Sequence, residues 1–155
     1  MKKKALLDSN IVIDYDRDTY RPDPIGAIDW LEEMISNRWR FFISEITVME
    51  TFKLYVRQTR PRELDEFKER FKLFQKERKV KILQLSKKIR KRARELMEIL
   101  CSQQIPPKGE DIIYDMFIAA TALEHSLTLF TQNIRHFNFV PGLQVEKPDY
   151  GDQEA

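Results

Sequence analysis

Cysteine, histidine and glycine are scarce in this chain of 155 residues, with one, two and four copies. A single cysteine excludes an internal disulfide bond and a cysteine-based zinc site, so we expect Cys101 to be a small core residue. The low glycine content excludes a fibrous repeat, and a hydrophobic fraction of 42% argues against disorder. No apolar run is long enough to span a membrane, and the first one ends at Asp8, too early for a signal peptide. We therefore expect a cytoplasmic protein without a membrane partner.

Positive charge is unevenly distributed, although the net charge is only +2. Residues 57–94 contain 16 of the 27 Lys and Arg residues but only 5 of the 25 Asp and Glu residues. This basic helical portion, taken as residues 57–101, would either hold a polyanion near an acidic pocket or form a pair of solvated charged helices. The length suits one domain with a buried core, which we expect at 1–150, followed by a frayed tail at 151–155.

Short apolar runs alternate with helical repeats, a pattern typical of an α/β fold. We expect strands at 4–7, 40–43, 80–83, 126–131 and 143–145, and helices at 9–16, 25–35, 45–56, 62–79, 87–101 and 111–125. Ser44 and Ser86 are candidate N-caps, and Pro61 is placed to open a helix. Such alternation predicts a mostly parallel sheet of four or five strands with helices on both faces. The carboxyl ends of its strands share one edge, where ligands bind.

Four polar residues are expected at that edge of the sheet. Asp8 follows the first predicted strand, and Asn133 follows the fourth by two residues. Glu50 and Asp115 lie in early turns of helices that begin at the same edge. Three carboxylates would repel one another without a cation, and ligation by oxygen alone favours Mg²⁺ or Mn²⁺ over zinc. The sequence therefore predicts a metal site in which the neutral asparagine takes the fourth position.

Three further residues are candidates for supporting this site. Asp111 precedes Asp115 by one helical turn and is either the N-cap of that helix or a neighbour of the metal. Asn10 either begins the first helix or orients Asp8 through its amide. Thr131, two residues before the fourth ligand, would support that ligand or contact a phosphate. The two histidines lack the spacing of a zinc site, and we expect structural roles for both, with the second more open to substrate.

Three segments point to one family when taken together: LLDSNIVID at 6–14, ISEITVMET at 43–51 and DMFIAATALEHSLTLFTQNIRHF at 115–137. They resemble the PIN-domain nucleases, and most closely the VapC-type toxins of toxin–antitoxin pairs. The resemblance implies a PIN-like fold, a Mg²⁺- or Mn²⁺-dependent endoribonuclease activity on RNA and a small antitoxin partner. By position it assigns catalytic and metal-binding roles to Asp8, Glu50 and Asp115, with Asn133 where many members have Asp. With the apolar helical residues at 25–35 and 52–56, it also implies a homodimer.

The basic helical portion supplies the candidate contacts to the RNA backbone, which are Lys87, Lys88, Arg90, Lys91 and Arg94. Two other doubly wound classes are disfavoured. A response-regulator receiver needs an acid after its third strand, where this chain has LQLS at 83–86. A phosphatase of the haloacid dehalogenase type needs Asp-x-Asp, where this chain has DSN at 8–10. The alternatives that stay open are a PIN-like RNA-binding module without catalysis and an RNA-processing nuclease without an antitoxin.

Overall fold

The computed structural model describes residues 3–104 and 112–151. The strands in these ranges are β1 (Lys3–Leu7), β2 (Trp39–Ser44), β3 (Lys81–Leu83), β4 (Thr128–Phe130) and β5 (Val145–Glu146). The helices are α1 (Ser9–Asp18), α2 (Ala27–Ser36), α3 (Glu45–Arg57), α4 (Pro61–Arg78), α5 (Lys87–Ser102) and α6 (Ile112–Glu124), with a 3₁₀ helix, η1 (Ile134–His136). Each predicted strand and helix has a counterpart, with boundaries that differ by a few residues.

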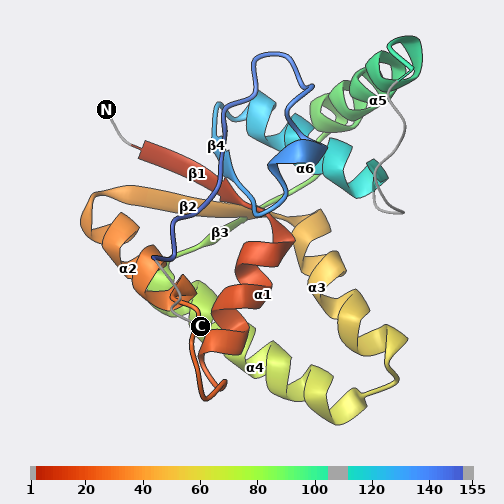
Figure 1. The fold of residues 1–155 in the computed structure, drawn as a ribbon. Coiled ribbons are helices and arrows are strands. Elements are labelled where there is room, and N and C mark those ends of the chain that lie inside the picture. Colours follow the sequence, from red (N-terminus) through yellow and green to blue (C-terminus); the bar gives the residue numbers. More distant parts are fainter. Residues whose placement is uncertain (1–2, 105–111, 152–155) are drawn as a thin grey trace.

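The strands form one parallel sheet in the order β3-β2-β1-β4-β5. The first strand of the chain lies in the centre, where Ala5 is opposite Phe41 of β2 and Thr128 of β4. Because all the pairings are parallel, the carboxyl ends of the strands lie at one edge. The predicted α/β fold, with a mostly parallel sheet covered on both faces, is confirmed (Figure 1).

Alternate residues of β1 are buried in two different hydrophobic cores, one on each face of the sheet. Ala5 and Leu7 are buried with side chains from α1, α2 and α4, and α3 adds partly buried residues to the same core. Leu6 is buried on the other face with side chains from α5 and α6. Figure 1 shows these two layers, with α1, α2 and α4 below the sheet and α5 and α6 above it. Both layers therefore depend on the central strand.

The helices that follow the strands begin with the predicted signals. Ser44 caps α3 by accepting a hydrogen bond from the Ile46 amide at 3.1 Å, and Ser86 caps α5 by accepting one from the Ile89 amide at 3.2 Å. Pro61 occupies the first turn of α4. Because each cap satisfies an amide that the helix itself cannot pair, it fixes the point where the strand gives way to the helix. These two helices thus start at the carboxyl edge of the sheet.

Two sequence expectations differ from the structure. Cys101 is exposed rather than buried, because α5 packs through Ala93, Leu96 and Leu100 and the next residue lies on its outer side. The fourth strand is shorter than expected, since Ser126 has a φ of 53° and turns the chain after α6. The short helix η1 was not predicted, because three residues are too few to show a helical period.

Some sequence predictions concern residues that the structure does not test. Asp111 and the tail residues 152–155 lie outside the described residues, and the expectations for them stay predictions. The expectation of one domain over 1–150 also stays a prediction. Within the described ranges, no helix combines the length and the apolar character needed to cross a membrane.

The loop before α2 is held by two distant parts of the chain. Asp18, at the end of α1, accepts hydrogen bonds from the backbone amides of residues 25–27 at 3.0, 3.1 and 2.7 Å. Gly26 has a φ of 100°, and a Cβ at this position would lie 2.5 Å from the carbonyl oxygen of Tyr150. Tyr150 in turn donates a hydrogen bond to Asp14 at 3.1 Å. Only glycine therefore fits between α2 and the C-terminal segment.

This packing predicts different costs for two glycine substitutions. Gly142→Ala, at a φ of 75° with the nearest atom 4.0 Å away, should lower the free energy of unfolding by about 1 kcal/mol through backbone strain alone. Gly26→Ala should cost at least about 1 kcal/mol more, because its methyl group would overlap the Tyr150 carbonyl. Urea unfolding followed by circular dichroism measures both. Equal costs would show that the Tyr150 contact does not constrain the loop.

Candidate active site

Asp8 lies where β1 passes into α1, and only 4% of it is exposed. Its Oδ1 accepts a hydrogen bond from the Ser9 backbone amide at 2.8 Å, and its Oδ2 accepts one from the Thr131 hydroxyl at 2.7 Å. A carboxylate has about four acceptor positions, so these two short bonds leave room for further ligation. Asp8 is therefore the N-cap of α1 and also a potential oxygen ligand.

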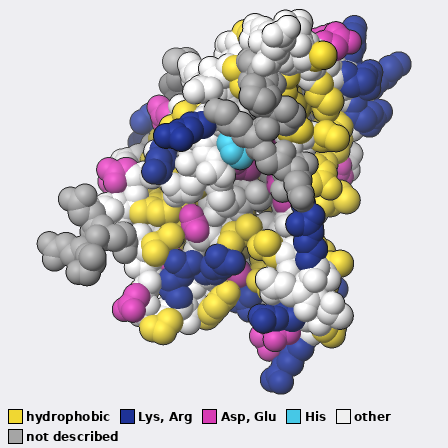
Figure 2. Space-filling model, turned by 45° about the vertical axis from the view of Figure 1, so that its right-hand side comes forward, with side chains coloured by type: hydrophobic (Ala, Val, Ile, Leu, Met, Phe, Trp, Pro, Cys, Tyr) yellow, Lys and Arg dark blue, Asp and Glu magenta, His cyan; other side chains and the backbone are white. Residues whose placement is uncertain are grey.

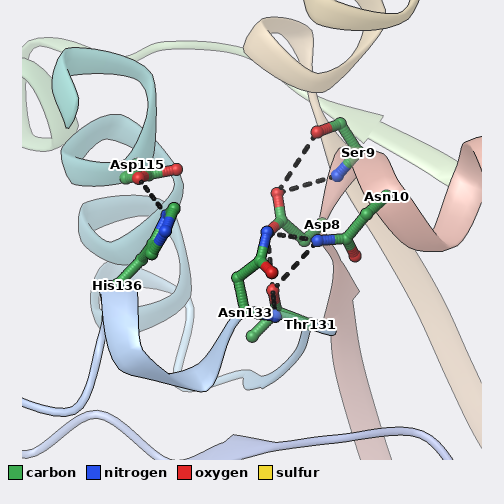
Figure 3. Close-up of polar contacts among 7 residues, drawn as sticks. All are labelled: Asp8, Ser9, Asn10, Asp115, Thr131, Asn133 and His136. Atoms are coloured by element: carbon green, nitrogen blue, oxygen red, sulfur yellow. Dashed lines mark hydrogen bonds and ion pairs between the residues drawn. The ribbon is translucent and has the colours of Figure 1, made fainter. Parts of the chain in front are cut away.

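The Thr131 hydroxyl joins the ends of β1 and β4. It donates to Asp8 and accepts hydrogen bonds from the Asn133 backbone amide at 3.0 Å and from the Asn10 side-chain amide at 3.3 Å. Asn10 also accepts a hydrogen bond from the Gln132 backbone amide at 3.2 Å. The Thr131 side chain is fully buried. These bonds fix the loop after β4 against the start of α1, and Figure 3 shows those that Thr131 makes.

Asp115 lies in the first turn of α6 and pairs with His136 from η1. Its Oδ2 is 3.0 Å from His136 Nδ1, and the carboxylate is buried whereas the imidazole is partly exposed. Figure 3 shows this pair on one side of the site, opposite Asp8 and Asn133. The carboxyl edge thus holds two acids from different helices, each oriented by a partner from the segment after β4.

The other two predicted ligands come from α3 and from the loop after β4. Glu50 is half-buried in the second turn of α3, which packs against α1 and α6. Asn133 occupies the N-cap position of η1, but its side chain makes no capping hydrogen bond and is exposed. The structure therefore places Asn133 beside Asp8 and places Glu50 on a helix adjoining those of the other two acids.

The electrostatics of Asp8 favour a nearby positive charge. Burial raises the pKa of the Asp8 carboxyl above its ordinary range. Hydrogen bonds from Thr131 and Ser9, and the charge that His136 can carry, oppose this rise without cancelling it. The ionised carboxylate is thus incompletely stabilised by the protein, and a bound cation would favour its charged form.

The donor atoms fit a hydrated divalent ion. Carboxylate and amide oxygens are the ligands preferred by Mg²⁺ and Mn²⁺. In the part of the chain that the structure describes, no three His, Cys, Asp or Glu side chains are grouped closely enough to enclose an ion. Mg²⁺ commonly binds through one or two carboxylates and keeps several waters, so Asp8 and Asp115 with an amide oxygen suit it.

The contact between His136 and Asp115 was not expected from the sequence, which predicted a structural role for this histidine with more access to substrate than His125. The pair with Asp115 depends on η1, in which residues three apart lie on the same side of the helix. Asn133 and His136 have this spacing, so both belong to the turn that borders the site. The spacing was visible in the sequence, but it indicates a shared side only once a 3₁₀ turn is known.

The basic helical portion is divided between the two faces of the sheet. On one face, α4 uses Arg70 to bind Asp16 at 2.6 Å and Arg78 to bind Glu32 at 2.7 Å. On the other face, α5 exposes Lys87, Lys88, Arg90, Lys91 and Arg94. Figure 2 shows Lys and Arg side chains in separate groups rather than in one continuous stripe. The basic side chains of residues 57–94 therefore do not form one continuous surface, and some of them stabilise the fold through ion pairs.

Comparisons with known proteins agree with this architecture. A family model described as the PIN domain matches residues 5–142. The structure of VapBC2 from Rickettsia felis bound to a promoter DNA fragment is 23% identical, with a TM-score of 0.74, covering 94% of this chain and 99% of that chain. VapBC-1 from nontypeable Haemophilus influenzae is 23% identical, with a TM-score of 0.71, covering 93% and 97%. A toxin–antitoxin complex from Klebsiella pneumoniae is 27% identical, with a TM-score of 0.59, covering 93% and 97%. No protein of curated function matches the chain.

The family match begins within β1 and ends beyond η1, so it includes all four predicted ligands, Asp8, Glu50, Asp115 and Asn133. The resemblance to the PIN-domain family, expected from the sequence, is confirmed by this match, and the VapBC structures share the fold. Members of the family are nucleases. Because the family model matches most of the length of the chain, the chain belongs to the PIN domain family.

Proposed function

We propose that the chain is a Mg²⁺- or Mn²⁺-dependent endoribonuclease and the cytoplasmic toxin of a type II toxin–antitoxin pair. The observation that carries the proposal is the buried Asp8 carboxylate, held at the edge of the sheet by Thr131 and placed opposite Asp115. Nucleases that hydrolyse phosphodiesters with metal ions need carboxylates fixed in this way beside the substrate. Membership of the PIN family supports the same reaction class.

Four residues would hold the metal ion. Asp8 and Asp115 would be the central ligands, with Glu50 from α3 and the amide oxygen of Asn133 completing the site directly or through water. A bound divalent ion supplies a Lewis acid for the phosphate and lowers the pKa of the attacking water.

Neighbouring residues keep the ligands ready for binding. The Thr131 hydroxyl and the Ser9 amide each hold one oxygen of Asp8, so the carboxylate need not reorient when an ion arrives. His136 contacts one oxygen of Asp115 in the same way. Outer partners of this kind typically change metal affinity or activity by about 10- to 100-fold. The site is thus proposed to be preorganised by the sheet edge and η1.

The proposed partners are a small antitoxin protein and a second copy of the chain. The similar structures include a toxin–antitoxin complex and two VapBC assemblies, which supports an antitoxin. For the homodimer, the apolar residues cited from sequence are mostly used inside the molecule: Ile28 and Ile35 pack on the core, and Phe52 packs on Phe67. The exposed apolar residues of α3 are Met49 and Val56. We therefore place the proposed dimer contact on this face of α3.

The metal mechanism predicts a large effect of Asp8→Asn, which removes a charge at nearly constant size. Cleavage of a labelled single-stranded RNA with Mn²⁺ should fall by at least about 100-fold, and EDTA should stop the wild-type protein. Asp29→Asn, which changes an exposed acid of α2, is the matched control and should cleave at the wild-type rate. If Asp8→Asn cleaves RNA at the wild-type rate, Asp8 acts only as a helix cap and not as a metal ligand.

Thermal unfolding tests the same site without catalysis. Mn²⁺ should raise the Tm of the wild-type protein and of Asp29→Asn, because an ion that binds only the folded state stabilises it. The Tm of Asp8→Asn should not respond. An equal rise in all three proteins would place the ion elsewhere.

The split of the basic helical portion predicts that the exposed cations of α5 contact RNA and that the exposed lysines of α4, at 68, 72 and 76, do not. Replacing Lys87, Lys91 and Arg94 together by Gln should weaken RNA binding and reduce the salt slope by about 2, at roughly 0.7 per phosphate on a single strand. Replacing Lys68, Lys72 and Lys76 of α4 makes the same change in charge on the other face and should leave the slope unchanged. Affinity is measured by anisotropy with Ca²⁺ in place of Mg²⁺. Equal slopes for both triple variants would show a general charge effect.

The proposed dimer predicts a change in mass when α3 is altered. Light scattering should give a dimer for the wild-type protein at micromolar concentration. Replacing Met49 and Val56 by Glu should give a monomer, because two charges from each copy would be buried unpaired in the contact. Leu73→Glu changes an apolar residue of α4 that is also more than half exposed, and this variant should remain dimeric. A wild-type monomer would contradict the dimer.

A further inference from the structure

We propose that a groove between α1, α3 and α4 binds an unpaired nucleotide of the RNA strand a few positions from the scissile phosphate. The groove is lined by Arg17, Tyr20, Thr51, Tyr55, Gln58 and Arg60, among others, and has a volume of about 120 Å³. This is smaller than typical drug-sized pockets and suits one flat ring. The inference rests on the proposed ribonuclease function and assigns part of its substrate-binding surface.

The groove is lined by residues of two helices, α1 and α3, that begin at the sheet edge of the candidate active site. α1 begins directly after Asp8, and α3 carries Glu50 next to Thr51, which lines the groove. Figure 1 shows α1 and α3 leaving the sheet edge in the same general direction, with α4 crossing below them. From Asp8 to the last residue of α1, Asp18, the helix rises about 15 Å at 1.5 Å per residue, and Tyr20 follows two residues later. A strand cut at the metal site can therefore reach the groove with its flanking nucleotides.

Tyr20 is an exposed aromatic residue that is nevertheless held in place. It is 58% exposed, and the Cζ atom of Arg70 lies 4.8 Å from the centre of its ring. Arg70 is fixed by two hydrogen bonds to Asp16, at 2.6 and 3.1 Å. Tyr55 is placed beside the same pair, with its hydroxyl 3.5 Å from Asp16. An immobilised ring with a large exposed area is the type of platform on which a base stacks with little loss of side-chain entropy.

The rim of the groove carries positive charge suited to a phosphate. Arg17 and Arg60 are both exposed, and neither forms a salt bridge with another residue in the described ranges. The one acid among the lining residues, Asp16, is already neutralised by Arg70. Proteins that bind single strands without reading their sequence combine stacking aromatic rings with a positively charged groove. Charge and shape therefore favour RNA over an apolar peptide segment.

Tyr20→Leu tests the stacking platform, and Tyr20→Phe is its matched control. The probe is a labelled single-stranded RNA of roughly 12 nucleotides, with Ca²⁺ suppressing cleavage. Tyr20→Leu should weaken binding about 5- to 100-fold, the range for losing one stacked base, whereas Tyr20→Phe should bind within about two-fold of wild type. Replacing Arg17 and Arg60 by Gln should reduce the salt slope by about 1.4. This second variant tests the groove even if Tyr20→Leu does not fold.

Cleavage of two substrates separates this proposal from the function on which it rests. With Mn²⁺, Tyr20→Leu should cut the long RNA more slowly than wild type but cut a trinucleotide, too short to reach the groove, at the wild-type rate. If the wild-type protein cuts neither RNA, the ribonuclease function fails. If it cuts both and the groove variants match it in affinity, salt slope and rate, the groove proposal is overturned. Variants that keep RNA binding but lose binding of an antitoxin would equally overturn it and assign the groove to a protein.

Discussion

The hydrogen bond from the Thr131 hydroxyl to Asp8 is the interaction on which the site depends. It links the central strand β1 with its neighbour β4, whose register places Leu7 opposite Phe130. The Asp8 backbone amide continues this pairing by donating to the Phe130 carbonyl at 3.0 Å. A shift of one residue in the register would turn these side chains to the other face. The geometry of the site is therefore set by the pairing of the strands, and the loops build on it.

Asp8 serves the fold and the chemistry at once, and the two roles compete. As the N-cap of α1 it stabilises the helix, an effect worth about 1 kcal/mol in other proteins. As a buried carboxylate with a raised pKa, it is held in a setting that disfavours its charge. The hydrogen bond from Thr131 stabilises the ionised carboxylate, but it does not fully offset the cost of burying the charge. Such residual electrostatic cost is what gives a buried acid its affinity for a cation.

The fold was predictable because each local signal agreed with the others. Ser44 and Ser86 mark helix starts after apolar strands, and the strand–helix alternation then implies the edge where Asp8 and Asp115 lie. The pair between Asp115 and His136 was not predictable, because it depends on a turn too short to leave a periodic pattern.

The basic helical portion shows a different limit of sequence reading. Its charges are contiguous in the chain, yet α4 and α5 lie on opposite faces of the sheet, separated by β3. The order of the elements in the sequence does not determine which face of the sheet a helix between two strands covers. Two arginines of α4, Arg70 and Arg78, are also bound to acids from α1 and α2, contacts that no composition count reveals.

The central position of β1 also governs when the protein becomes complete during synthesis. Asp8 leaves the ribosome early, whereas β4 and Thr131, its partners in the sheet, are made more than a hundred residues later. A nascent chain can pair β1 with β2 and bury one layer, but the edge that carries the chemistry does not yet exist. The nuclease activity proposed for this edge would thus be absent from unfinished chains and could begin only once the strand that carries Thr131 has been made and paired.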